Sequence, residues 1–423
     1  MQSNFHPVAW IQQSNIYEVN LRQYTQEGSI QAFKAHLPRL KAMGVDCLWM
    51  MPITPISREK RLGSLGSYYA CSDYKAINPE FGTIGDFRLL VQEAHRLDMK
   101  LIIDWVANHT GWDHIWTQTH PEYYKKNAAG SFYDNHGWTD VIDLNYYDQS
   151  MRAAMIDAMQ FWIDECDIDG FRCDMAHLVP LDFWRQARQA LDGRKPLFWL
   201  AETEDWQYMD VFDCCYAWNW MHQTQKLYAG EITVTALRQE LEAYQRRTSD
   251  DRCQLFFTSN HDENSWNGTE YEKYGDAALA LAVFSITWNG LPLIYSGQEL
   301  PNTKRLAFFD KDQIEWNGKP ALEDFYTRLL QLRTTHPAMA AGNKAVPLLL
   351  HTDVDDQVLA FHRKLDEREI LVMLNLSGRQ QDFHLSNNII SGSFQDLFTG
   401  RITDFGNNAA FSLDPWQYRV LSK

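Results

Sequence analysis

The segment IDGFRCDMAH, from Ile168 to His177, combines a short apolar strand pattern with charged groups at its end. Arg172 and Asp174 are two positions apart, so on a strand their side chains share one face and can form an ion pair. A guanidinium beside a carboxylate favours the ionised form of the acid. The segment therefore predicts a parallel strand whose carboxyl end carries functional groups.

Seven other segments of similar length and apolar character accompany this one along the chain. Between them lie helical patterns, such as AFKAHLPRLKAMG, which ends at Gly44, and GDFRLLVQEAHRL, which follows Thr83. Alternating strands and amphipathic helices indicate a parallel sheet, and eight such strands predict an α/β fold of the (β/α)8 TIM-barrel type. The predicted strands are 16–20, 46–51, 100–106, 168–173, 196–201, 211–216, 254–259 and 291–296.

Two regions depart from this alternation. Residues 109–147, rich in His, Trp, Tyr, Gly and Asn, follow the third strand, and connections longer than about 15 residues are uncommon unless functional. Residues 341–423 contain short alternating runs such as VLAFHRK and EILVMLNL, which predict antiparallel strands. We expect a catalytic barrel from residues 1–108 and 148–340, a short inserted domain at 109–147, and a C-terminal β-sandwich at 341–423.

The composition argues against several classes of partner. Lys plus Arg number 39 and Asp plus Glu 55, so the formal net charge of −16 opposes binding to nucleic acid or to an anionic membrane. The longest apolar run, Ala277 to Trp288, is far shorter than the ~20 residues that span a bilayer. Seven scattered cysteines and opening residues without a secretory pattern predict a cytoplasmic protein. The oligomeric state does not follow from these patterns.

Acids and histidines recur where the predicted strands end. Singly, an Arg-Asp pair is usually structural and a Glu after a strand is often a loop acid, but together they are hard to explain as solvated surface. Glu202 follows the apolar run PLFWLA, a setting that favours the protonated acid. An ionised Asp174 and a protonated Glu202 about 5 Å apart would cleave a glycosidic bond with retention. The segments begin at Asp104 (DWVANH), Gly170 (GFRCDMAH), Leu200 (LAETED) and Ser259 (SNHDEN).

In motif order and spacing, nearly the whole chain resembles the α-amylase superfamily of glycoside hydrolases, of the family 13 type. The four segments match that family's motifs at the ends of barrel strands three, four, five and seven. The resemblance implies that Asp174 is the nucleophile, Glu202 the general acid/base and Asp262 a third carboxylate that grips sugar hydroxyls. It also implies that Arg172, His109 and His261 support substrate binding and that Asp104 is a structural acid.

Other segments extend the resemblance. GSYYACSDYKAINPEFGT places Tyr69 where the family stacks a tyrosine on the reacting sugar, while DLN at 143–145 and GLPLIYSGQE resemble further motifs. One position departs from the pattern, because many members carry Lys-His three and four places after the nucleophile, where this chain has His177 and Leu178. We expect His177 to line the pocket, with a packed structural histidine as the alternative.

The sequence allows a bound calcium ion without requiring one. Asn108 matches a common calcium-site residue of the family, although a loop hydrogen bond explains it equally well. The loop NLRQYTQEGS lacks the acids and glycines by which some relatives bind calcium, which takes six to eight oxygen ligands. We expect no required cofactor and an activity that survives chelation.

The implied activity is hydrolysis of α-1,4-glucosidic bonds in starch-like α-glucans or maltooligosaccharides. An exo-acting α-glucosidase and a 4-α-glucanotransferase remain alternatives, because they would use the same chemistry in a differently shaped pocket. The alternative from another class is a catalytically inactive barrel that binds carbohydrate or protein. Such barrels usually lose a catalytic carboxylate, and this chain keeps all three.

Overall fold

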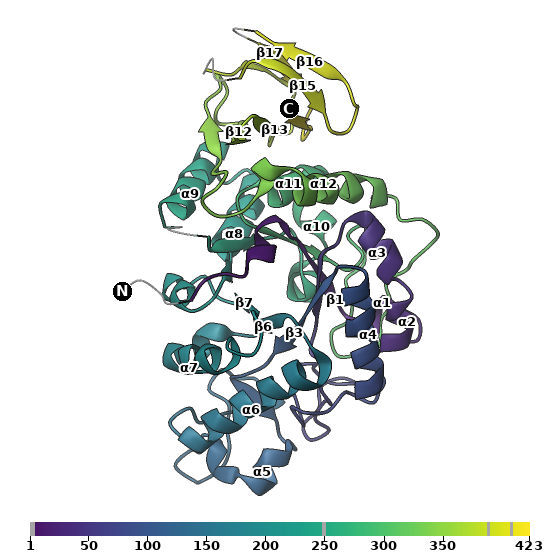
Figure 1. The fold of residues 1–423 in the computed structure, drawn as a ribbon, viewed down its shortest axis with the longest axis vertical. Helices are drawn as coiled ribbons and strands as arrows, with labels where there is room; N and C mark the ends of the chain where they lie inside the picture. The colour runs from purple at the N-terminus through teal and green to yellow at the C-terminus, as the bar shows by residue number, and fades with distance from the viewer. Residues whose placement is uncertain (1–4, 248–250, 387–389, 407–408) are drawn as a thin grey trace.

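The computed structural model describes residues 5–247, 251–386, 390–406 and 409–423 of the 423-residue chain (Figure 1). Eight parallel strands form a closed barrel in the order β1-β10-β9-β8-β7-β6-β3-β2, which confirms the predicted TIM-barrel fold. Each predicted strand overlaps one of them. Their bounds are β1 Ile16–Val19, β2 Cys47–Met50, β3 Lys100–Trp105, β6 Gly170–Cys173, β7 Phe198–Ala201, β8 Cys214–Tyr216, β9 Cys253–Phe256 and β10 Leu291–Tyr295.

Both faces of the barrel strands are buried, so their sequences are apolar without strict alternation. In β3, Ile102 packs inside the barrel, while its neighbours Leu101 and Ile103 pack outward against the helices. The same period of two carries the inner face onward from Ile102 to Asp104. The inner face of a barrel strand therefore changes from apolar to charged at its carboxyl end.

Amphipathic helices surround the barrel, and the helix ends predicted at Gly44 and Thr83 are present. The stretch predicted as one helix before Gly44 is divided into α2 and α3. Gly44 closes α3 with φ 101°, a left-handed conformation that glycine adopts without strain. Thr83 begins α4 with a capping box that Asp86 completes. The helices are α1 Leu21–Tyr24, α2 Ile30–Lys34, α3 Leu37–Met43, α4 Ile84–Arg96, α5 Ile115–Thr119, α6 Gln149–Cys166, α7 Leu181–Leu191, α8 Trp218–Tyr228, α9 Val234–Arg247, α10 Glu270–Tyr274, α11 Ala278–Thr287 and α12 Glu323–Thr335.

Helix α11 contains most of the longest apolar run and is buried beneath the C-terminal region. The Phe361 ring lies 5.0 Å from that of Trp288. Arg363 Nη1 donates to the carbonyls of Thr287 and Trp288, at 3.0 Å each, and so joins the C-terminal region to the barrel. No helix in the described ranges combines the length and the hydropathy needed to cross a membrane.

Residues after β3 leave the barrel and return to it through a small antiparallel pair. Strand β4, His109–Gly111, pairs with β5, Val141–Asp143, so that His109 lies opposite Asp143. Helix α5 lies between them in the chain, and Figure 1 places it at the end of the molecule opposite the C-terminal strands. The segment therefore projects from the barrel while both its ends remain anchored at β3 and α6.

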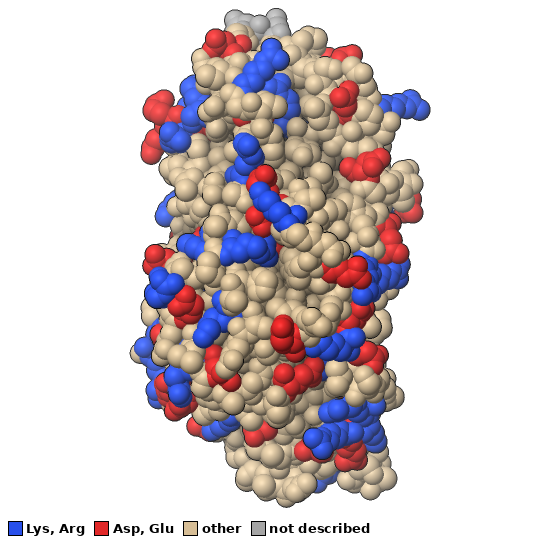
Figure 2. Space-filling view, turned by 90° about the vertical axis from the view of Figure 1, so that its right-hand side faces the viewer, with Lys and Arg blue, Asp and Glu red and all other residues tan. Residues whose placement is uncertain are grey.

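The C-terminal region is all antiparallel β-structure. Six strands form a sheet in the order β11-β12-β13-β18-β15-β16, and β14 pairs separately with β17. Phe383 of β14 and Phe411 of β17 pack in one apolar cluster with Phe394 of β15. Figure 2 shows acidic and basic side chains interspersed over one face of the molecule. The strands are β11 Leu348–Leu350, β12 Val358–Leu365, β13 Arg368–Asn375, β14 Gln381–His384, β15 Gly392–Asp396, β16 Ile402–Phe405, β17 Ala410–Leu413 and β18 Tyr418–Ser422.

Candidate active site

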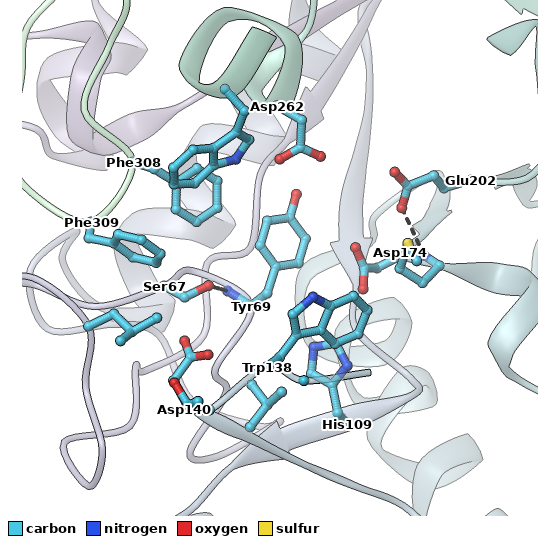
Figure 3. A pocket seen from close by; sticks show the side chains of 16 residues that line it. Ser67, Tyr69, His109, Trp138, Asp140, Asp174, Glu202, Asp262, Phe308 and Phe309 are labelled. Carbon is cyan, nitrogen blue, oxygen red and sulfur yellow. Dashed lines mark hydrogen bonds between the residues drawn. The ribbon is translucent and has the colours of Figure 1, made fainter. Parts of the chain in front are cut away.

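A cavity of about 350 Å³ opens beside the carboxyl ends of the barrel strands (Figure 3). Asp174 directly follows β6, Glu202 directly follows β7, and Asp262 lies in the loop after β9. Parallel strands present their carboxyl ends at one face of the barrel, so residues distant in sequence meet there. Other residues that line the cavity are Ser67, Tyr69, His109, Trp138, Asp140, Met175, Trp266, Phe308 and Phe309.

The guanidinium of Arg172 binds three carboxylates beneath the cavity. Its Nη1 lies 3.0 Å from Asp104 Oδ1 and 3.1 Å from Asp174 Oδ1, and its Nη2 lies 2.8 Å from Glu202 Oε2. The Arg172 side chain is 1% exposed, so water screens these interactions little. The ion pair that the sequence suggests between Arg172 and Asp174 is present, and it belongs to a larger network.

Asp174 and Glu202 compete for this cation. Glu202 Oε2 accepts from Arg172 and from the Met175 N–H, each at 2.8 Å, whereas Asp174 Oδ2 has no hydrogen-bond partner among the described residues. Burial, followed by the charge of Glu202, raises the pKa of Asp174 well above its usual range, and Arg172 offsets only part of this. The contact with Arg172 favours the ionised form of Asp174, as the sequence suggests, but one cation does not neutralise several buried carboxylates. In the free site the surroundings of Asp174 therefore favour its protonated form on balance.

Met175 contributes to the site through its backbone. Its φ of 40° lies in the left-handed region, where a non-glycine residue stores of order 1–3 kcal/mol of strain. In this conformation its N–H points at Glu202 Oε2. The strained residue directly after Asp174 thus positions the second carboxylate, a role that the sequence pattern did not indicate.

His261 lies between two acids. Its Nδ1 is 2.5 Å from Glu18 Oε1, and its Nε2 is 3.3 Å from Asp262 Oδ2. Burial lowers the pKa of His261, but the charges of Asp262 and Glu18 outweigh it and raise this pKa to about 9. His261 is therefore a cation at neutral pH. The sequence reasoning missed Glu18, although an acid inside the otherwise apolar strand IYEVN is a signal that could have revealed it.

Tyr69 lies flat at the base of the cavity. Its ring stacks on His261 at 5.5 Å and 20°, and on Phe308 at 6.2 Å and 13°. Its hydroxyl donates to Asp104 Oδ2 at 3.1 Å and lies 2.7 Å from His261 Nε2. The ring can offer a flat apolar surface to a sugar, while the hydroxyl connects two charged groups of the network.

The remaining predicted residues occupy different positions relative to the cavity. His109 lines it, and burial lowers the pKa of His109 to about 4, so its ring is neutral at pH 7. Asn108 Nδ2 lies 3.1 Å from His109 Nδ1 and so orients that ring. Asp104 lies beneath Tyr69 and also accepts from Trp49 Nε1 at 3.2 Å. His177 is exposed and does not line the cavity, so its substrate role remains a prediction.

One group of side chains near the inserted segment has the composition of a cation site: Asp134, His136 and Asp143. Its Asp143 Oδ2 already accepts from Lys125 Nζ at 2.9 Å and from Asn135 Nδ2 at 3.2 Å. Calcium prefers six to eight oxygen ligands, whereas this group offers an imidazole and an adjacent ammonium. These residues do not fit a calcium ion, and the Asn108 amide is directed to His109.

Aromatic side chains that the sequence reasoning missed form one side of the cavity. Trp138 contacts the His109 ring at 5.3 Å, and Trp266 contacts Phe308 at 5.2 Å. Trp138 comes from the inserted segment, Trp266 from a short π-helix after β9, Glu263–Asn267, and Phe308 from the loop after β10. The aromatic richness of 109–147 was the available signal for Trp138.

Comparison with known proteins identifies this arrangement. A family model described as "Alpha amylase, catalytic domain" matches residues 12–140 and 122–325. The chain belongs to the α-amylase family. It is therefore a glycoside hydrolase built on the family's barrel. A maltogenic α-amylase, AmyB from Thermotoga neapolitana, has a similar solved structure, with a TM-score of 0.90, 28% identity and coverage of 97% of this chain and 99% of that one.

Curated relatives agree with this family while differing in length. α-Amylase MalA of Haloarcula japonica is 26% identical over 418 residues, which cover 92% of this chain and 59% of that protein. An intracellular maltogenic amylase of Bacillus subtilis is 25% identical over 372 residues, or 82% of this chain and 62% of the relative. The chain thus spans about three fifths of these two proteins.

Proposed function

We propose that this α-amylase-family enzyme hydrolyses α-1,4-glucosidic bonds of maltooligosaccharides or starch-like α-glucans with retention of configuration. The observation that carries the proposal is the meeting of Asp174, Glu202 and Asp262 around one cavity above the Tyr69 ring. Asp174 and Glu202 both bind the guanidinium of Arg172, which supports the short separation of about 5 Å that a double displacement needs. The names of the amylase relatives support the choice of substrate.

In this mechanism Asp174 attacks the anomeric carbon while Glu202 protonates the departing glycosidic oxygen. The covalent glycosyl intermediate is then hydrolysed by a water that the Glu202 carboxylate deprotonates. A glycosidic oxygen bound against Glu202 is a hydrogen-bond acceptor and therefore favours the acid form of that residue, while the guanidinium of Arg172 favours the ionised form of Asp174. Arg172 supports that anion throughout the reaction.

Other residues bind and orient the reacting glucose. Asp262 is 38% exposed, so its carboxylate faces the cavity for sugar hydroxyls while His261 holds it from behind. The neutral His109 imidazole can donate or accept a hydrogen bond at the same sugar. The ring face of Tyr69 stabilises the positive charge of the oxocarbenium-like transition state.

The order of anomers released tests the double displacement. Proton NMR during early hydrolysis of maltoheptaose should show the α-anomer first, whereas an initial β-anomer would exclude this mechanism. Maltoheptaose labelled at its reducing end separates the related activities in the same reaction. Internal cleavage supports an amylase, release of single glucose units an exo-acting α-glucosidase, and lengthened labelled chains a glucanotransferase.

A cytoplasmic location belongs to the same proposal. All seven cysteines are free and buried, which suits a reducing compartment. The intracellular relative in Bacillus subtilis also supports it. Cell fractionation with an antibody against the chain is the direct test.

A further inference from the structure

In the part of the chain that the structure describes, Asp140 is a buried acid that faces the cavity without a side-chain partner; its carboxylate accepts a hydrogen bond only from its own backbone N–H. It is 7% exposed and lines the cavity, and within the described ranges no side chain pairs with it or donates a hydrogen bond to it. The other acids of the cavity differ, because Asp174 and Glu202 bind Arg172 and Asp262 binds His261. A buried polar group without a partner is costly unless a ligand supplies the hydrogen bond.

The backbone around Asp140 holds it in place. The N–H groups of His136 and Trp138 donate to Asp134 Oδ2 at 2.8 and 2.7 Å, which fixes the preceding turn. The next residue, Val141, begins β5 and pairs with β4. Burial raises the pKa of Asp140, a hydrogen bond from its own backbone N–H offsets part of this, and the nearby charge of Asp134 raises it further. These surroundings favour neutral hydroxyl donors over anionic ligands.

Figure 3 shows where this carboxylate lies relative to the cleavage point. Asp140 lies on one side of Tyr69, together with Ser67 and Phe309, and Glu202 lies on the other. A general acid must contact the glycosidic oxygen, so the scissile bond lies toward Glu202. The non-reducing part of the substrate then extends from Tyr69 away from Glu202, toward Asp140.

We propose that Asp140 is a specificity-determining residue that binds hydroxyl groups of the second glucose on the non-reducing side of the cleaved bond. This inference rests on the proposed function and refines it, since it makes a two-glucose glycone the preferred donor. Phe309 and Ser67 line the cavity on the same side of Tyr69 as this carboxylate in Figure 3, so that side offers an apolar ring together with polar groups, as sugar recognition requires. The preference arises because a single glucose stacked on Tyr69 leaves the Asp140 carboxylate without its hydrogen bonds.

The test compares p-nitrophenyl α-maltoside with p-nitrophenyl α-glucoside. In Asp140→Asn, the ratio of kcat/KM for maltoside to that for glucoside should fall roughly tenfold to a hundredfold, the range expected for losing hydrogen bonds to a charged acceptor. The melting temperature should not decrease, because the substitution removes an unpartnered buried charge. Glu122→Gln, an exposed acid on the same inserted segment, is the matched control and should leave the ratio unchanged.

A binding measurement separates this inference from the proposed function. Calorimetry of maltose binding to Asp174→Asn and to Asp174→Asn/Asp140→Asn requires no turnover. The double variant should bind maltose more weakly than the single variant, by the same roughly tenfold to hundredfold factor that is expected for the kcat/KM ratio. If wild type cleaves neither aryl glycoside but the second substitution weakens maltose binding, the proposed reaction fails and the role of Asp140 stands. The role of Asp140 is overturned if the ratio of kcat/KM values and the maltose affinity are both unchanged. It is also overturned if kcat/KM falls equally on both substrates and the melting temperature is lower.

Discussion

Two parts of the cavity differ in how they are built. The first part is the floor of the cavity, which we call the base in the structural sense and not in the sense of a proton acceptor. It comprises residues in or directly after barrel strands or their adjoining loops: Asp104, Arg172, Asp174, Glu202 and His261. Its charged groups bond one another, and the Arg172 side chain is 1% exposed. The second, the aromatic wall, comprises Trp138, Asp140, Trp266, Phe308 and Phe309, which come from three segments that connect barrel strands and helices. In the wall, Trp266 is 51% exposed.

This difference separates chemistry from selectivity. A bond-breaking step requires groups held within fractions of an ångström, which buried, mutually bonded side chains on a barrel provide. Recognition of a longer sugar needs surface that can vary without disturbing that geometry, and loops provide it. Changes in the base should therefore alter turnover, whereas changes in the wall should alter substrate preference.

The largest effect should follow from Asp174→Asn in the base. Losing the nucleophile should lower kcat by several orders of magnitude, because the covalent step is removed. Folding should persist, since the substitution removes an acid whose pKa is raised by burial. Rates on maltoheptaose and melting curves measure both, with the exposed Asp382→Asn as control. Near wild-type turnover would show that another residue is the nucleophile.

Tyr69 lies where base and wall meet, so two substitutions there sharpen the comparison. Tyr69→Ala removes the ring under the reacting sugar and should lower kcat/KM by roughly a hundredfold or more. Tyr69→Phe keeps the ring but loses the hydroxyl contacts with Asp104 and His261, at a cost of about tenfold. Kinetics and melting temperature should be measured for both. An alanine variant that melts early yet turns over normally below its melting point would make Tyr69 a packing residue.

The acid limb of the pH profile tests how strongly the charge of Glu202 acts on Asp174. Activity needs ionised Asp174 and is lost as the pH falls through its pKa, which burial and Glu202 raise, so the limb should lie above the usual range for aspartate. Glu202→Gln removes one cause and should move the limb to lower pH. The variant is assayed on α-maltosyl fluoride, whose leaving group needs no acid catalyst. A limb that stays in place or moves upward would exclude this coupling.

A smaller effect is expected from Trp266→Ala in the wall. The half-exposed indole contacts Phe308 and Phe309, and losing it should raise KM for maltoheptaose by about tenfold or less while kcat changes little. The melting temperature should change by only a few degrees, because the side chain is half in solvent. Ile402→Ala, exposed on the C-terminal region, is the control. A large fall in kcat would place Trp266 functionally in the base.

The smallest effect should follow from removing metal ions. Lys125 already pairs with Asp143, and the group around it does not fit calcium, so chelation should leave hydrolysis rates and melting temperature unchanged. The assay is dialysis against EDTA followed by rates on maltoheptaose, with and without added calcium. Loss of activity restored by calcium alone would show that a calcium site supports the base.

The base was largely predictable from sequence because strands obey a local rule. Alternation with a period of two puts Asp104 on the inner face after Ile102, and Arg172 on the same face as Asp174. Once eight strands close into a barrel, their ends must converge. Glu18 obeys the same rule two positions after Ile16, so its omission was a failure to apply the pattern to β1.

The sequence by itself therefore determined the barrel, its helix ends and the residues at its catalytic face, because each follows from short-range periodicity and capping. Only the tertiary structure decided the aromatic wall, the exposed position of His177 and the raised pKa of Asp174. Loop side chains such as Trp138 and Phe308 meet the cavity through contacts between distant segments, which no local pattern encodes. A pKa likewise depends on burial and on every nearby charge, and these exist only after the chain has folded.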